Sequence, residues 1–165
     1  MRVTVPVKLL VAAALGALAA TPAPADVRIL ASPGGAVLPY IEMFEAVRRS
    51  GERVVIDGPC FSACTLVLSM LPRSQICVTR RAVLGFHAAR AIDARGRSYA
   101  APQATAVVLE TYPPPVRDWI MRRGGLTSRV LLLRGRDLAA MLRWREYSVF
   151  RGRATCHASS LFARS

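Results

Sequence analysis

The sequence contains almost no lysine, because Lys8 is the only one among 23 basic residues and arginine supplies the rest. Acidic residues are few as well, at 10, so the formal net charge is +13. The arginines are not interleaved with aromatic residues of the kind that stack on bases, so we expect no specific nucleic-acid partner. A solvated basic surface is the simplest interpretation. Binding to an anionic envelope surface is the alternative.

Histidine is also scarce, since His87 and His157 are the only two. Neither has a second ligand at the spacing that zinc requires, so we expect no metal site. Cys60 and Cys64 are four positions apart and therefore do not form the CxxC motif of thiol oxidoreductases. ATP-binding motifs are absent, and we expect no cofactor.

The chain has a single long apolar run, which lies near its start. It spans Leu9–Ala20, follows Arg2 and Lys8, and is itself followed by small residues up to Ala25. A basic start, a short apolar centre and small residues predict a secretory signal at 1–25, cleaved near Ala25. An uncleaved anchor is the alternative, but 12 residues fall short of the about 20 that a spanning helix needs. We therefore expect a periplasmic or secreted protein.

Export would place four cysteines in a compartment where disulfides persist. The candidates are Cys60, Cys64, Cys77 and Cys156. Four cysteines allow three pairings, and the sequence does not choose among them.

Hydrophobic periodicity after the signal predicts alternating strands and helices. This order is typical of a single α/β domain at 26–150 with mostly parallel strands, followed by an irregular tail at 151–165. We expect a surface excursion at 89–103. The expected strands are 26–30, 53–57, 75–80, 82–88 and 129–133, and the expected helices are 38–51, 62–71, 105–110, 113–125 and 136–144.

Three features along this pattern carry chemical interest: a Gly34–Gly35 turn after a strand, Ser62 at the start of a buried helix, and His87 at the end of an apolar strand. Alone, each has an ordinary structural explanation as a turn, a helix cap or a core histidine. Together they fit acyl transfer by a serine, which needs a nucleophile, a base and backbone donors for the oxyanion.

The segments "SPGG", "GPCFSA" and "RSQICVTRRAVLGFHA" resemble, in their residues and in their order along the chain, the ClpP peptidase group of the ClpP/crotonase superfamily. The intervals of 28 residues from Gly34 to Ser62 and 25 from Ser62 to His87 are similar too. The resemblance implies a ClpP/crotonase-like layered fold. It also implies Ser62 as nucleophile, His87 as base, and an oxyanion hole formed by Gly34 or Gly35 together with Ala63.

Two departures from the family pattern stand out. Only the predicted signal precedes the first strand, so the sheet is trimmed at its start. The loop that carries the family's acidic third member has no carboxylate here. Asp137 lies 50 residues after His87, close to the family interval, but its pattern places it inside the last helix. Asp118 and Asp93 are the other candidates, and a Ser/His dyad without a third group is the remaining alternative.

Three functions are compatible with these features. The first is an exported serine hydrolase that acts as a peptidase on peptides or unfolded protein segments. The second is a catalytically inactive binding or structural module of the cell envelope with a basic surface. Acyl chemistry on thioesters, as in crotonase relatives, is a third, which export disfavours. The sequence leaves the substrate and the oligomeric state open.

Overall fold

The computed structural model describes residues 26–143. The predicted signal at 1–25 and the predicted tail at 151–165 lie outside the described residues, as do Cys156 and His157. In chain order the elements are β1 (Asp26–Ile29), α1 (Val37–Ser50), β2 (Arg53–Ile56), β3 (Pro59–Phe61), η1 (Ser62–Leu66), α2 (Val67–Met70), η2 (Arg73–Gln75), β4 (Ile76–Val78), β5 (Val83–Phe86), β6 (Arg90–Ile92), β7 (Ser98–Ala100), α3 (Pro102–Thr111), α4 (Pro114–Met121), β8 (Leu131–Arg134) and α5 (Gly135–Arg143).

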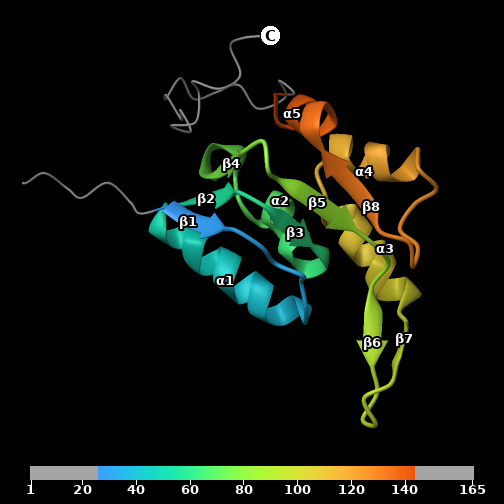
Figure 1. Cartoon of the computed structure of the whole chain (residues 1–165). Helices are drawn as coiled ribbons and strands as arrows, with labels where there is room; N and C mark the ends of the chain where they lie inside the picture. Colours follow the sequence, from blue (N-terminus) through green and yellow to red (C-terminus); the bar gives the residue numbers. More distant parts are fainter. Residues whose placement is uncertain (1–25, 144–165) are drawn as a thin grey trace, which may run out of the picture.

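The strands form two three-stranded sheets and one hairpin (Figure 1). The first sheet has the order β1-β2-β4 and is entirely parallel. The second has the order β3-β5-β8, in which β3 and β5 are parallel and β8 is antiparallel. The predicted α/β class with mostly parallel sheets is therefore confirmed for these two sheets.

A single parallel bridge between Ser32 and Cys60 connects the two sheets. The Ser32 N–H donates to the Pro59 carbonyl at 2.8 Å, and the Phe61 N–H donates to the Ser32 carbonyl at 2.9 Å. Gly58 makes this approach sterically feasible, because a Cβ there would lie 1.9 Å from the Leu30 carbonyl oxygen. The segment after β1 is thus held beside the strand that leads to Ser62.

One apolar cluster joins the layers. Helix α1 contributes Phe44 and Val47, both buried, and ends at Gly51 in the left-handed conformation that commonly terminates helices. The central strands β2 and β5 are almost completely buried, as expected for strands covered on both faces. Helix α4 adds Trp119 and Ile120 from the other side.

The sequence predictions hold for most elements and fail at two places. The helix expected at 62–71 is a 3₁₀ turn, η1, followed by the single α-helical turn of α2, and it is preceded by the unexpected strand β3. The surface excursion expected at 89–103 contains an antiparallel hairpin, β6–β7, which projects from the body beside α3 in Figure 1. No helix within 26–143 is long and apolar enough to cross a membrane.

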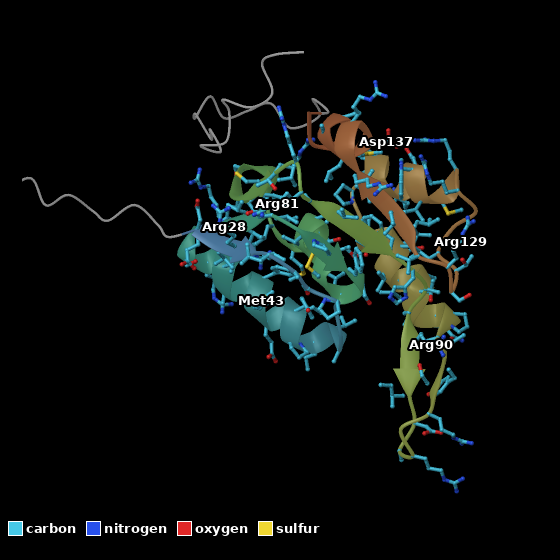
Figure 2. The ribbon with its side chains drawn as sticks, in the orientation of Figure 1. Arg28, Met43, Arg81, Arg90, Arg129 and Asp137 are labelled. Carbon is cyan, nitrogen blue, oxygen red and sulfur yellow. A yellow bond between two sulfur atoms is a disulfide. The ribbon has the colours of Figure 1, made fainter. Side chains whose placement is uncertain are left out.

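A buried carboxylate anchors the end of β2. Asp57 accepts hydrogen bonds from Thr79 Oγ1 at 2.6 Å, from Arg28 at 2.8 Å and from the Arg81 guanidinium. The bonds from Arg81, and then from Thr79, hold the pKa of Asp57 well below its usual range. Three strand ends are therefore tied to one ionised group. Figure 2 labels Arg28 and Arg81 on this side of the molecule.

The low pKa of Asp57 predicts a loss of stability in acid. A carboxyl whose folded pKa is depressed stabilises the fold above its unfolded pKa, about 3.9, and this stabilisation is lost as pH falls below that value. Urea unfolding between pH 7 and pH 2 should show a decline that is shallower in Asp57→Asn. Asp118→Asn, which changes an exposed carboxyl on α4, is the control and should follow the unmodified protein. Equal acid sensitivity in Asp57→Asn would contradict this role.

Candidate active site

Ser62 stands where β3 ends and η1 begins, and its backbone is unusual. Its φ of 54° makes it the only described residue other than glycine with a positive φ. This left-handed conformation is costly for a residue with a side chain, so the surroundings must stabilise it. The cap of η1 is Phe61, and no side chain caps the helix. The ordinary explanation of Ser62 as a helix cap is therefore wrong.

The Gly34–Gly35 turn packs directly against Ser62. Gly34 has a φ of 84°, and a Cβ built on it would lie 2.5 Å from Ser62 Cβ and 3.1 Å from the Ala63 nitrogen. Only glycine fits here, for both steric and conformational reasons. The Gly34 N–H is directed at Ser32 Oγ at 3.4 Å, and Ser32 Oγ in turn bonds the Tyr40 hydroxyl at 2.7 Å. The turn is thus fixed against the backbone of the candidate nucleophile.

A hydrogen-bond chain supports Ser62 from the other side. The Thr65 hydroxyl donates to the Ser62 carbonyl at 2.6 Å, so the Tyr112 hydroxyl must be the donor in its 2.6 Å bond with Thr65. Burial raises the pKa of Tyr112 to about 12, which keeps this donor protonated near neutral pH. The Tyr112 ring also packs edge-on against Phe86, at 5.2 Å between centroids.

A disulfide between Cys60 and Cys64 spans Ser62, with 5.3 Å between their Cα atoms. Disulfide bonding among the four candidate cysteines is therefore confirmed, and the structure supplies a pairing that the sequence left open. The closed loop is very short, so its effect on the entropy of the unfolded chain is smaller than the about 3 kcal/mol of a 15-residue loop. Its main contribution is therefore to limit the backbone around Ser62. Cys77 is also disulfide-bonded.

His87 follows β5, and one nitrogen of its ring is oriented by the backbone. Nδ1 lies 2.7 Å from the Ala88 carbonyl oxygen. A carbonyl oxygen only accepts, so the proton is on Nδ1, and Nε2 of the neutral ring carries the lone pair. The Ala89 N–H of the same peptide group donates to Thr105 Oγ1 at 2.9 Å. The Ala88 N–H donates to the Thr127 carbonyl at 2.7 Å, so Ala88 is fixed on both sides. His87 is thus in the tautomer that a general base requires.

Ser62 and His87 line the same cavity, which has a volume of about 320 Å³. Both side chains are half-buried, and the cavity lies within the range typical of small-ligand sites. Gly35 and Ala63 line it as well, whereas Gly34 packs against Ser62 and is not one of the lining residues. Among the described residues no hydrogen bond joins Ser62 Oγ to His87, and such bonds are often formed only when substrate is present.

The three carboxylates considered as a third member lie elsewhere. Asp137 is in α5, more than half exposed, and pairs with Arg123 at 3.4 Å. Figure 2 labels it at α5, well away from Arg90, which lines the cavity. Asp93 pairs with Arg97 in the turn of the β6–β7 hairpin, and Asp118 is exposed on α4. The structure therefore does not bring Asp137 to His87, where the Ala88 carbonyl occupies the orienting position.

Comparisons with known proteins give no relative. Neither a family model nor a curated protein nor a solved structure matches this chain. The site therefore has to be interpreted from its own chemistry. Within residues 26–143, no three His, Cys, Asp or Glu side chains are grouped so that they could hold a metal ion.

Sequence reasoning missed two residues that support the site. Thr65 lies three positions after Ser62, which is a spacing at which a threonine hydroxyl reaches a backbone carbonyl, and this signal was present in the sequence. Tyr112 is 47 positions from Thr65, and nothing local to it indicates the contact.

The disulfide assignment is checked by peptide mapping without reduction. Trypsin cleaves after Arg53 and Arg73, so Cys60 and Cys64 belong to one peptide, 54–73. We expect this peptide to be recovered unlinked to any other and lighter by two hydrogens than its reduced form. Recovery of 54–73 cross-linked to a peptide that contains Cys77 or Cys156 would contradict the pairing.

The supporting chain is checked by Tyr112→Phe, which removes only a hydroxyl and keeps the ring packed on Phe86. Loss of the hydrogen bond to Thr65 should lower the free energy of unfolding by about 1 kcal/mol in urea denaturation. Tyr99→Phe is the matched control, because Tyr99 is 54% exposed, and its stability should be unchanged. Equal free energies of unfolding for the two variants would show that the hydrogen bond from Tyr112 to Thr65 does not stabilise the fold.

Proposed function

We propose that this chain is an exported, ClpP-like serine hydrolase that acts as a peptidase on peptides or unfolded protein segments. The observation that carries the proposal is the geometry of Ser62. Its strained backbone, packed under the Gly34–Gly35 turn, shares one cavity with a His87 ring whose Nδ1 carries the proton. A helix cap or an ordinary turn requires none of these constraints.

The chemistry follows from these positions. Nε2 of His87 takes the proton from Ser62 Oγ as that oxygen attacks the substrate carbonyl carbon. The carbonyl electrons move to oxygen, and the N–H groups of Gly35 and Ala63 stabilise the resulting oxyanion. His87 then gives the proton to the leaving amine as the C–N bond breaks, and water releases the acyl group from Ser62 by the reverse sequence.

The two oxyanion donors have different origins. Ala63 is in the first turn of η1, where backbone N–H groups have no partner within the helix. Gly35 lines the cavity, and a Cβ built on it would meet nothing within 4 Å, so its backbone is open to a ligand. The Gly34 N–H is already directed at Ser32 Oγ, and we therefore assign Gly35 rather than Gly34.

The orienting group for His87 is a neutral carbonyl rather than a carboxylate. A carbonyl fixes the tautomer and the ring orientation, as an aspartate would, but it stabilises the transient imidazolium less because it carries no full charge. We expect a slower serine hydrolase than one with a complete triad. The catalytically inactive envelope module is the competing function, and it predicts no reaction at Ser62 at all.

The test is labelling of the purified mature protein with a fluorophosphonate probe, which phosphonylates activated serines. Ser62→Ala should abolish labelling, and His87→Ala should lower its rate by orders of magnitude, because a neutral hydroxyl without a base is a poor nucleophile. Ser69→Ala alters another serine of the same segment, outside the cavity, and should label like the unmodified protein. Absence of labelling on the unmodified protein would favour the inactive module.

Stability measurements accompany the labelling, so that loss of reaction is not mistaken for unfolding. Ser62 caps no helix, so Ser62→Ala should leave the free energy of unfolding nearly unchanged. Ser62→Gly should raise the free energy of unfolding, because glycine adopts a φ of 54° without steric cost.

A further inference from the structure

The cavity at Ser62 has an unusual charge. Of the side chains between residues 26 and 143 that line it, only His87 and Arg90 are basic, and none is acidic. The remaining walls are largely apolar, with Val37, Leu66 and Ile92 among them. A ligand that fills this cavity therefore meets apolar surface with one permanent positive charge at its edge.

Arg90 is held at this edge by Ser98 on the facing strand of the hairpin, two positions from its direct partner Ala100. It is the first residue of β6, and its Nε donates to Ser98 Oγ of β7 at 2.6 Å, while Nη2 donates to the Ser98 carbonyl at 3.2 Å. Ser98 lines the cavity too. Figure 2 labels Arg90 at the base of the projecting hairpin, where the hairpin joins the body. The guanidinium is thus positioned by a rigid element rather than by a mobile side chain alone.

The Arg90 guanidinium retains donors for a ligand. It has five N–H groups, of which the two bonds to Ser98 use two. Within the described part of the chain no carboxylate pairs with Arg90, in contrast to Arg97 of the same hairpin, which pairs with Asp93 at 2.8 Å. One N–H of Nη1 and the remaining N–H of Nη2 form the end-on edge, which matches the geometry of a carboxylate bound with two parallel hydrogen bonds.

We propose that Arg90 makes this site selective for acyl substrates that carry a carboxylate close to the scissile bond. This inference rests on the proposed function and names its substrate class: peptides with an acidic side chain or a free C-terminal carboxylate near the bond that Ser62 attacks. Apolar walls bind the neighbouring part of the substrate, and Arg90 fixes the register by pairing with the anion. Arg90 touches the substrate away from the reacting atoms, so it determines specificity.

Binding of fluorescent peptides, measured by anisotropy on Ser62→Ala so that none is consumed, tests the inference. Three peptides of equal length are compared: one neutral with glutamine and an amidated C-terminus, one with glutamate in place of the glutamine, and one with glutamine and a free C-terminus. The measured quantity is the ratio of Kd for the neutral peptide to Kd for each carboxylate peptide. We expect a ratio of about ten, which corresponds to about 1.4 kcal/mol.

Variants of Arg90 separate a specific contact from general attraction by a basic protein. Arg90→Gln should bring the ratio close to one. Arg90→Lys, which keeps the charge but loses the planar fork, should give an intermediate value. Arg95→Gln is the matched control, because it removes one positive charge from the turn of the same hairpin without altering the cavity lining. It should keep the ratio of the parent.

A preference for glutamate alone, for the free C-terminus alone or for both supports the inference and identifies the source of the carboxylate. A ratio near one, a ratio that survives Arg90→Gln, or an equal loss in Arg95→Gln overturns it. The fluorophosphonate result is independent. Labelling at Ser62 with a ratio near one retains the hydrolase and rejects the selectivity, whereas an Arg90-dependent ratio without labelling rejects the hydrolase and retains carboxylate binding.

Discussion

The contact between Gly34 and Ser62 is the constraint on which the rest of the site depends. The two residues follow strands of different sheets, β1 and β3, and each adopts a left-handed backbone conformation at the point where they meet. Any side chain at position 34 would collide with the Ser62 Cβ, so the turn and the strand end can pack only with glycine there. The bridge between Ser32 and Cys60, the Thr65 bond and the disulfide all act on this one junction.

Acidic groups are distributed unevenly between the strand ends and the cavity. The buried carboxylate of Asp57 accepts hydrogen bonds from Arg28, Thr79 and Arg81 at the strand ends, and Asp57 does not line the cavity. Within residues 26–143 no carboxylate lines the cavity, and His87 is oriented by a peptide group. The acid that is most strongly bonded in this part of the chain, Asp57, thus serves the strand ends and not the cavity.

The sequence predicts much of the fold because strongly periodic segments depend on local information. The strand at Asp26, the helix ending at Gly51 and the proline-initiated helix α4 all follow from hydrophobic spacing and terminating residues. The division of 62–71 into η1 and α2 does not, because it results from the strained turn at Ser62. Hairpin β6–β7 was missed because its strands have three residues each and little buried surface. The order of Gly35, Ser62 and His87 along the chain groups them at one predicted site, and the three line one cavity. Arg90 and Tyr112 line the same cavity through tertiary packing that the sequence does not indicate.

The disulfide that spans Ser62 links the shape of the site to the redox state of its surroundings. In a reducing compartment the turn would depend on the Ser32–Cys60 bridge, the Thr65 hydrogen bond and the Gly34 contact, without the covalent link, and the left-handed backbone at Ser62 would relax more easily. In an oxidising compartment the five-residue segment from Cys60 to Cys64 is closed on itself around the serine. The same polypeptide would thus have a looser turn at Ser62 while Cys60 and Cys64 are reduced, and a more rigid one once they are oxidised.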